Sequence, residues 1–586
     1  MYAHRAIKFN PQQVPPASPA RKTNLQVSKE LATEFCNNTS IHGVKYFVGS
    51  DRAIVEKVWW IVVFLVSLYG CGRLIHTVYM KWESEPVIVT FAQKPTPVFQ
   101  IPFPAVTICP ETKTKTDDFN FTYTIRQVET IISDKKLEDL QKYPKDELNK
   151  LLAMMQICDF EMTAGVDKFN QIYDSDCVEL LRNMSVPQDE VFITCNWRTE
   201  IINCTDRYRL TLTDVGFCYT FNTIAGEDLM REDQLQREFQ YITETRSSSN
   251  WSMEDGYVSG LDIHTYPHRI IGAGIKAGIA VMLKANESDL DYLCGNSFQG
   301  FKVLLHMPNE YPQLLNQHFR VPLNQEVAVS VTPRMIITSD KIKTYKPDRR
   351  QCYFNHERYL KFFKVYTQTN CELECLANFT LKRCNCVKFS MPRAPGVNIC
   401  GISNEICYQN ATIELLELEV KIRENPKMTH PDDCHCLPSC TSVMYNTEIS
   451  QATFEWKRLL PVFKQYKDEL DGVQVSHLLV FFKDAQFIPV KRNELFGLSD
   501  FLANCGGLLG LFMGVSLLSL VEIIYYCAIK PLVMWIRPQH ERQARKNTVK
   551  PVEAIAYPKT NLAAPEYFVK EPIGVWKMPV IPRKDY

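Results

Sequence analysis

Hydrophobic positions of this chain gather in two long runs, which flank a large region of mixed pattern. The second run, residues 501–521, contains no charged residue and is long enough to cross a bilayer as a helix. The first run, residues 58–80, is interrupted only by Arg73 and His76 near its far end. It follows 57 mostly polar residues, which is not the pattern of a signal peptide. With no third run of this length, the pattern predicts two transmembrane helices.

Charge sets the expected orientation of these helices. Residues 1–50 hold six Lys or Arg against two acids, and residues 528–550 hold six against one. An excess of basic residues marks the cytoplasmic side, so both termini are expected inside the cell. The chain then divides into a cytoplasmic segment (1–57), a first membrane helix (58–80), an extracellular domain (81–497), a second membrane helix (498–530) and a cytoplasmic tail (531–586).

Two further patterns indicate that the 417 residues from 81 to 497 are extracellular. Seventeen of the 21 cysteines lie between Cys109 and Cys440, a density typical of an oxidising compartment. Seven sequons for N-glycosylation fall in the same region, at Asn120, Asn183, Asn203, Asn250, Asn286, Asn378 and Asn410.

Periodicity within this region predicts a mixed α and β domain. Residues 326–332 and 301–305 alternate polar and apolar side chains, as half-buried strands do. Apolar residues have helical spacing from Ile125 to Leu140 and again over residues 357–381. The fold class expected is therefore an α+β membrane protein with two transmembrane helices and a large, disulfide-rich extracellular domain.

Clustered cysteines allow two interpretations. Cys371 and Cys375, four residues apart, lie on one face of a predicted helix, and Cys384-Asn-Cys386 and Cys434-His-Cys436 follow. The pattern favours a ladder of disulfides, and a zinc site remains the weaker alternative. No H-E-x-x-H, G-x-S-x-G or P-loop motif is present. We therefore expect no enzyme, no metal, no cofactor and no nucleic-acid partner.

The second apolar run is unusual in composition. Gly506, Gly510 and Gly514 recur every four residues, so one face of the helix is nearly bare backbone. Bare faces let helices pack closely, or let carbonyl groups face water. Ser516 follows, and the run ends at Glu522; ionisable residues in a span usually mark an ion path. A glycine-rich packing face is the alternative.

These features together resemble a known superfamily. The second run contains G-G-L-L-G-L-F-M-G-V-S, and F-P-A-V-T-I-C follows the first run at Phe103 to Cys109. His42-Gly43 precedes the first run by fifteen residues, and C-Y-T-F-N begins at Cys218. The motifs occur in the order seen in the degenerin/epithelial sodium channel superfamily. The cysteine-rich insert is most similar to that of the insect pickpocket branch.

The resemblance implies a trimer, homomeric or built with related subunits, and a set of disulfides. The implied pairs are Cys109–Cys218, Cys352–Cys440, Cys371–Cys436, Cys375–Cys434, Cys384–Cys407 and Cys386–Cys400. Five extracellular cysteines then remain, namely Cys158, Cys177, Cys195, Cys204 and Cys294. Because five is odd, one of them is free or has a partner elsewhere.

The resemblance also implies roles for individual residues. The selectivity filter aligns with Gly514, Val515 and Ser516. The outer gate at the degenerin position aligns with Ala503 and Asn504. The pore lining aligns with Gly506, Gly507, Gly510 and Glu522. His42 and Gly43 match the cytoplasmic gating dipeptide, and Tyr79 the aromatic that couples the wrist to the extracellular domain. Many relatives have Asp where this chain has Asn504, which puts in doubt any concentration of cations at the pore mouth.

The function expected is that of a sodium-permeable, amiloride-sensitive trimeric cation channel. It would lie in the lipid of the plasma membrane of a sensory or epithelial cell. It would be gated through its extracellular domain. An ATP-gated channel would need a basic triphosphate pocket, which the sequence does not show. The alternative retained is a non-conducting subunit, or one that needs an obligate partner. The gating stimulus and the ion selectivity ratio are not encoded in any motif.

Overall fold

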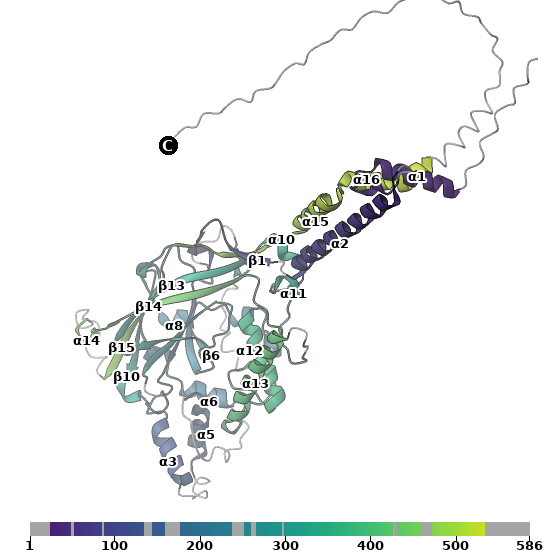
Figure 1. Cartoon of the computed structure of the whole chain (residues 1–586). Helices are drawn as coiled ribbons and strands as arrows, with labels where there is room; N and C mark the ends of the chain where they lie inside the picture. The colour runs from purple at the N-terminus through teal and green to yellow at the C-terminus, as the bar shows by residue number, and fades with distance from the viewer. Residues whose placement is uncertain are drawn as a thin grey trace, which may run out of the picture. The chain divides into compact units, whose positions relative to one another are not determined.

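The computed structural model describes residues 24–48, 52–84, 87–133, 143–158, 176–236, 251–258, 265–295, 298–425, 428, 430–459 and 472–533 (Figure 1). The chain forms two compact units. One comprises Met1–Ile75 with Asn504–Tyr586, and the other comprises His76–Ala503. The second unit holds the extracellular domain predicted from the sequence, and each unit is described by itself below.

The larger unit is built on two β-sheets. The eight-stranded sheet runs in the order β1 (Val87–Phe91), β17 (Val490–Glu494), β13 (Gln325–Thr338), β15 (Val473–Phe482), β10 (Ile279–Asn286), β4 (Phe192–Trp197) and β5 (Glu200–Ile202), with β14 (Ser442–Thr453) paired to β13. The five-stranded sheet runs β12 (Phe319–Pro322), β11 (Gly300–His306), β3 (Ala105–Pro110), β7 (Gly216–Phe221) and β6 (Tyr208–Thr213). Two small ladders pair β2 (Thr96–Pro97) with β16 (Gln486–Phe487) and β8 (Trp251–Ser252) with β9 (Gly256–Tyr257).

The two large sheets enclose a shared apolar core. Strand β13 alternates as predicted, with Val327, Val329 and Val331 fully buried and the residues between them partly exposed. Strand β11 differs from the prediction, because all seven of its residues are buried. It is a strand, yet it is not half-buried, since Leu304 packs into a second small cluster on the face opposite Phe301. The polar Lys302 is accommodated by an ion pair with buried Glu111.

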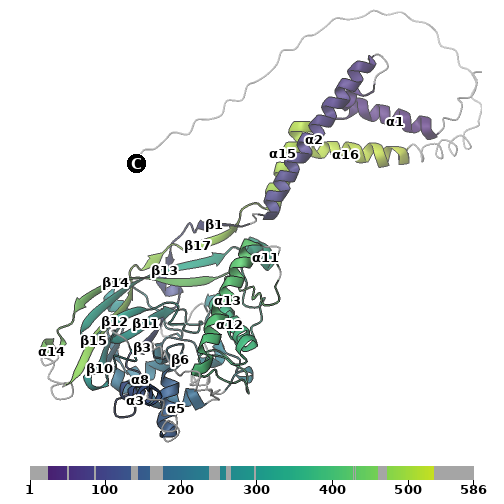
Figure 2. The ribbon, with the colours of Figure 1, turned by 60° about the horizontal axis from the view of Figure 1, so that its bottom comes forward.

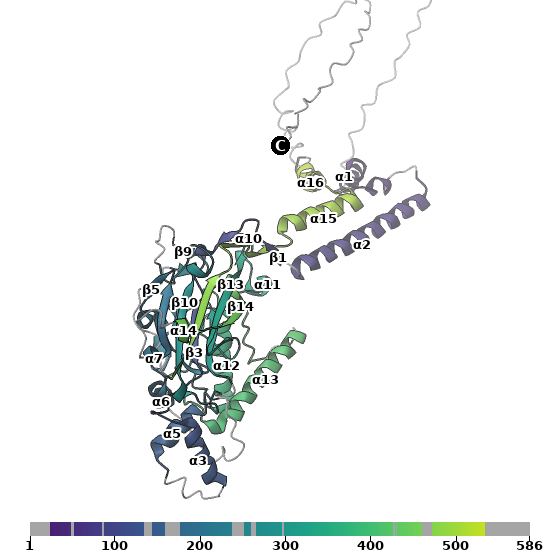
Figure 3. The same cartoon turned by 90° about the vertical axis from the view of Figure 1, so that its left-hand side faces the viewer.

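Helices cover one end and one flank of these sheets (Figures 1, 2 and 3). Helices α3 (Phe121–Ser133), α5 (Lys145–Met154) and α6 (Asp176–Met184) lie together at one end, and α12 (Gln368–Cys384) and α13 (Glu405–Glu424) run side by side along the flank. Short helical turns connect the strands, namely η2 (Val98–Gln100), α7 (Gln188–Val191), α8 (Cys204–Arg207), α9 (Gly226–Leu229), η4 (Glu232–Gln234), η6 (Ile275–Ala277), η7 (Glu287–Asp289), α10 (Asp340–Lys343), α11 (Pro347–Arg350), η8 (Ile402–Asn404) and α14 (Trp456–Leu459).

One helix prediction is corrected by these bounds, and a second is tested only in part. The helix predicted over 357–381 begins only at Gln368, where the Thr367 hydroxyl caps the first turn by accepting from the Asn370 amide at 3.1 Å. The carboxylate of Glu357 instead accepts from the Phe354 amide at 2.9 Å, which holds that stretch in a turn. Helix α3 ends at Ser133, and Leu137 and Leu140 lie outside the described residues.

The smaller unit is helical in its described part. Helix α1 (Asn24–Asn38) and the turn η1 (Val44–Tyr46) precede α2 (Ile54–Ser84), which is long and apolar enough to cross a membrane. The boundary between the units falls after Ile75 in α2 and after Ala503 in the second apolar segment. Helices α15 (Leu498–Met513) and α16 (Leu517–Ile524), followed by the π-helix η10 (Tyr525–Ile529), form the second apolar segment. The segments Leu498–Met513 and Leu517–Val533 pass the same test only together, since each alone is too short, and the chain bends by 73° at the break between them.

Candidate pore and gating site

The bend between α15 and α16 falls on Gly514, Val515 and Ser516, the three residues that the resemblance aligns with a selectivity filter. None of the three is helical, and Gly514 has a φ of 67°, a left-handed conformation that costs glycine little. Ser516 then starts α16: its hydroxyl accepts from the Ser519 amide, and the Ser519 hydroxyl accepts from the Ser516 amide. A glycine in φ > 0 followed by a capping serine therefore breaks the helix cleanly.

His42 and Gly43 lie against this break. The His42 amide donates to the Met513 carbonyl at 2.8 Å, so it satisfies one of the carbonyls left open at the end of α15. A side-chain carbon at Gly514 would overlap the His42 imidazole, which occupies that space. Gly43 has a φ of 87° and leads into η1. The proposed gating dipeptide and the proposed filter are thus brought together within one unit.

The same N-terminal segment also engages Glu522. One carboxylate oxygen of Glu522 accepts from the Ser40 amide at 3.0 Å and from the Ser40 hydroxyl at 3.2 Å. The Ser40 hydroxyl shares a further 2.6 Å hydrogen bond with the Ser519 hydroxyl. Hydrogen bonds from the Ser40 amide and hydroxyl fix the position of the Glu522 side chain. Glu522 is therefore held by residues 39–40, an arrangement that the sequence pattern did not indicate.

The glycine-rich face of α15 is open in this chain. Within the described part of the chain, side-chain carbons built at Gly506 and Gly507 would meet nothing within 4 Å, and one at Gly510 would lie 3.9 Å from the Val515 carbonyl oxygen. Ala503 and Asn504 are exposed on the same helix. Nothing described within the chain requires these glycines to be small.

The end of α2 carries an aromatic cluster. The Tyr79 ring lies 6.1 Å from the Trp82 ring and 6.4 Å from the Phe501 ring, between centroids. Trp82 contacts the segment 340–350: the Arg349 guanidinium lies 4.3 Å above its ring and donates to its backbone carbonyl at 3.1 Å. The sequence interpretation missed Trp82, although it lies one helical turn beyond Tyr79 in a predicted interface.

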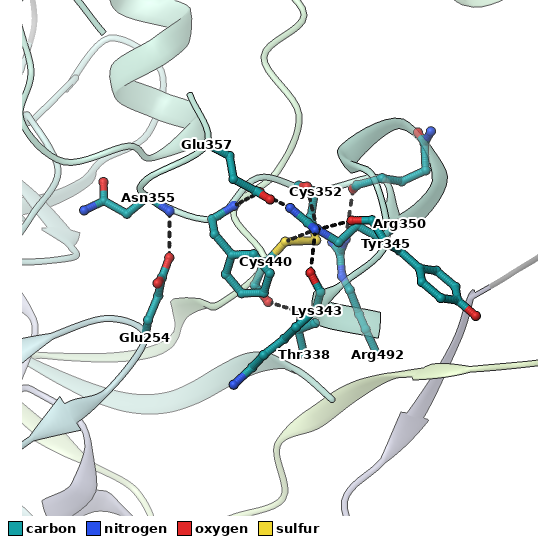
Figure 4. A network of polar contacts seen from close by, with 12 residues as sticks. Glu254, Thr338, Lys343, Tyr345, Arg350, Cys352, Asn355, Glu357, Cys440 and Arg492 are labelled. Atoms are coloured by element: carbon teal, nitrogen blue, oxygen red, sulfur yellow. Dashed lines mark hydrogen bonds and ion pairs between the residues drawn. A yellow bond between two sulfur atoms is a disulfide. The ribbon is translucent and has the colours of Figure 1, made fainter. Parts of the chain in front are cut away.

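Next to Arg349, the buried Arg350 ties this segment to the disulfide Cys352–Cys440 (Figure 4). Its guanidinium pairs with Glu357 and donates to the backbone carbonyls of Lys343, Tyr345 and Cys352. A buried cation with this many acceptors is costly to remove singly, since its partners would be left unpaired. Burial, together with the carboxylate of Glu494, raises the pKa of Tyr345 to about 12.

The structure forms eight disulfides in the larger unit. Six are the pairs implied by the resemblance, namely Cys109–Cys218, Cys352–Cys440, Cys371–Cys436, Cys375–Cys434, Cys384–Cys407 and Cys386–Cys400. Two more pair Cys158 with Cys294 and Cys195 with Cys204, which leaves Cys177 as the odd thiol. Burial raises the pKa of the Cys177 thiol to about 12, so it is protonated and inert at neutral pH. Among the described residues, no group of three His, Cys, Asp or Glu could hold a metal ion.

Most of the sequon asparagines lie at the surface. Asn120, Asn183, Asn203, Asn378 and Asn410 are exposed and Asn286 is half-buried, whereas Asn250 lies outside the described residues. The Asn203 side chain also caps α8 by accepting from the Thr205 amide. Accessibility to a glycosyltransferase is thus met at five of the six positions that the structure describes.

Comparison with known proteins agrees with this geometry. Residues 35–526 match the family described as "Amiloride-sensitive sodium channel", and the chain belongs to this family of ion channels. It is 27% identical to Pickpocket protein 28 of Drosophila melanogaster over 88% of this chain and 81% of that protein. It is 24% identical to the Sodium channel protein Nach of the same species (90% and 92%) and 22% identical to the human Bile acid-sensitive ion channel (89% and 93%).

These matches confirm the resemblance to the degenerin/epithelial sodium channel superfamily and to its pickpocket branch. The family consists of plasma-membrane cation channels and not of enzymes, and its members assemble from related subunits. The mixed α and β architecture with its disulfides is that of this family.

Proposed function

We propose that this chain is a subunit of a sodium-permeable, amiloride-sensitive trimeric channel of a sensory or epithelial plasma membrane, opened through its extracellular domain. In this proposal α2 and the α15–α16 pair are the two membrane spans, and both termini are cytoplasmic. The assembly is a homotrimer or a heterotrimer with related subunits. The relatives named for sodium channels and for bile-acid sensitivity support the class of function, and the proposal extends it to sodium selectivity and amiloride block.

The observation that carries the proposal is the helix break at Gly514, Val515 and Ser516. Breaking a helix frees backbone carbonyls, and three copies around an axis would present a ring of them to a partly dehydrated ion. A transmembrane anchor has no need of such a break, because an unbroken helix satisfies every carbonyl internally.

The open glycine face supports the same assembly. Gly506, Gly507 and Gly510 are not crowded by any described residue of their own chain, so their small size is explained by neighbours outside it. In a trimer, the α15 helices of three subunits would approach each other along this face and line the pore. Ala503 and Asn504 would lie at its outer end, where a small side chain permits closure.

The inner end of the proposed pore is formed by the N-terminal segment. His42 closes over Gly514, and Ser40 holds Glu522, so the filter and the acidic residue are both set by residues that precede α2. His42 and Gly43 would thereby act on conduction without lining the outer pore. We assign the coupling of the extracellular domain to α2 to Trp82 and Arg349, with Tyr79 in support.

The test is whole-cell current from this chain expressed alone, with Ala503→Val compared with Ala503→Gly. A bulky residue at position 503 is expected to hold the pore open and give a constitutive, amiloride-blocked current that is larger in sodium than in potassium. Ala503→Gly stays small and should match the wild type. Silence of Ala503→Val, with surface biotinylation equal to that of the wild type, would overturn conduction by this chain alone and point to an obligate partner subunit.

A further inference from the structure

A groove of about 710 Å³ lies beside helix α3 in the larger unit. One wall is a single face of α3, whose members recur at helical spacing: Tyr123, Arg126, Gln127 and Thr130. The other wall comes from residues 288–293, which are far away in sequence. The groove is therefore made by the tertiary fold, and its volume is within the range of small-molecule sites.

Asn120 lines this groove at the start of α3, and it carries a glycosylation sequon. It is exposed, and Thr122 completes the sequence N-F-T. The Asn120 side-chain oxygen accepts from the Tyr123 amide at 2.8 Å, as the side chain of a helix-capping residue does. N-glycosylation uses the side-chain nitrogen, so the oxygen keeps this bond. A glycan on Asn120 would therefore start at the wall of the groove and leave the cap of α3 intact.

Two tyrosine rings line the groove and are largely exposed. Tyr123 is 61% exposed and Tyr292 is 64% exposed. Rings left in water forgo the free energy that their burial would contribute. A sugar ring has an apolar face of C–H groups and a polar rim, which matches a tyrosine ring with its hydroxyl at the tip. The exposed side chains of Arg126 and Gln127 add hydrogen-bond donors for the sugar hydroxyls.

The carboxylates that line the groove are already used by the protein. Asp289 accepts from the Thr116 amide at 3.1 Å. Asp291 accepts from the Thr122 amide at 3.0 Å and from the Thr122 hydroxyl at 2.6 Å. These bonds join the start of α3 to the other wall and hold the groove in shape. The groove therefore suits a neutral, hydroxyl-rich ligand and not a cation.

We propose that Asn120 is glycosylated and that its glycan docks along this groove, with sugar rings against Tyr123 and Tyr292. Helix α3 rises about 15 Å between Asn120 and Thr130, a length that several linked sugars span. In the transfer, the Asn120 side-chain nitrogen forms a bond to C1 of a lipid-linked oligosaccharide. The bond from C1 to the lipid diphosphate breaks, and the nitrogen loses one proton. The proposal does not depend on conduction by this chain.

The test is the rate at which an endoglycosidase removes each glycan from the folded, detergent-solubilised full chain. The chain is expressed in cells that make only high-mannose glycans, and mass spectrometry follows each site. Asn203 is the matched control, because it is exposed and its side chain also caps a helix, but it does not line the groove. The enzyme needs the undocked glycan, so docking for about nine-tenths of the time slows release at Asn120 about tenfold. Denaturation should abolish this delay, which gives a second reference at Asn120 itself.

Three variants separate docking from mere attachment. Tyr292→Ala should raise the native rate at Asn120 to its denatured value, whereas Tyr292→Phe keeps the ring and should leave release slow. Asn120→Asp removes the glycan and keeps a capping oxygen, so it should lower the thermal midpoint more than Asn203→Asp does. The proposal is overturned if Asn120 carries no glycan or if its glycan is released equally fast from the folded and the denatured chain. It is also overturned if Tyr292→Ala leaves release slow, or if the two Asn→Asp variants have the same thermal midpoint.

Discussion

The two units of this chain are specified by their sequences in different ways. In the larger unit, strands such as β13 bury every second side chain and eight disulfides join distant segments, so most positions are explained by contacts within the chain. In the smaller unit, the helix break is set by the backbone conformation of Gly514 and by its contact with His42, whereas side-chain carbons built at Gly506 and Gly507 would meet no described residue within 4 Å. Contacts within the chain therefore account for the larger unit and for the helix break, and they leave the glycine face of α15 to the assembly proposed above.

The largest effect is expected from a substitution at Gly514, in the smaller unit. Gly514→Ala is expected to abolish the Ala503→Val current, because the added carbon overlaps the His42 imidazole and the residue must hold a φ of 67°. Gly72→Ala is the matched control, since a carbon at Gly72 meets nothing described within 4 Å. Whole-cell current, normalised to surface protein, measures both. A normal current from Gly514→Ala would show that the break is not set by the glycine.

A double variant sharpens that result. Removing the imidazole with His42→Gly relieves the overlap but not the backbone strain at position 514. Partial recovery of the Gly514→Ala current by His42→Gly would assign the loss to the contact between the two residues. If the double variant is no better than Gly514→Ala alone, backbone strain is the dominant cause.

The larger unit should respond most strongly to loss of a disulfide that closes a long loop. Cys352–Cys440 spans 88 residues and Cys195–Cys204 spans nine. Loop entropy predicts that replacing the first pair by serine costs about 2 kcal/mol more in unfolding free energy than replacing the second. Thermal unfolding of the solubilised chain measures the difference. Equal losses would show that chain entropy is not what these bonds contribute.

A pH dependence of stability is expected from Glu310. Because its pKa is raised from 4.5 to about 7 in the folded chain, the folded state binds a proton between these values that the unfolded state releases. The free energy of unfolding therefore falls as the pH rises through this window, by up to about 1.4 kcal/mol per pH unit. Glu310→Gln should flatten the slope of the thermal midpoint against pH. An unchanged slope would mean that Glu310 titrates as it does in the unfolded chain.

The smallest effect is expected at the contact between Arg349 and Trp82 within the larger unit. Arg349→Gln removes the cation above the Trp82 ring and should shift the gating equilibrium by about 1 kcal/mol, a severalfold change in open probability. Lys346→Gln, an exposed position on the same segment, is the control. Single-channel recording in the Ala503→Val background measures the open probability. If both substitutions act alike, net charge rather than the stacked contact is responsible.

Much of the smaller unit could be predicted because its determinants are local. A run without charge indicates a membrane helix, and a glycine followed by a capping serine indicates a break, whatever the rest of the chain does. The contact of Ser40 with Glu522 could not be predicted, because it joins residues 482 positions apart in sequence.

In the larger unit, period-two patterning predicted β13 but misjudged β11, whose second face is covered by a cluster containing Leu314. Helical spacing over 357–381 gave no sign that the Glu357 carboxylate accepts a hydrogen bond from the Phe354 amide and forms an ion pair with Arg350. Sequence periodicity therefore predicts local structure, and it does not predict contacts between segments far apart in sequence.

The contact between His42 and Gly514 also bears on how the protein is made. The two residues are separated by 472 positions (514 − 42), which a ribosome adding about 5 to 20 residues per second covers in roughly 24 to 94 seconds. During that interval α15 does not yet exist, so residues 39–42 have neither the Met513 carbonyl nor Glu522 to bind. The N-terminal segment can therefore form these contacts only after the last helices have been synthesised, so this end of the smaller unit is completed last.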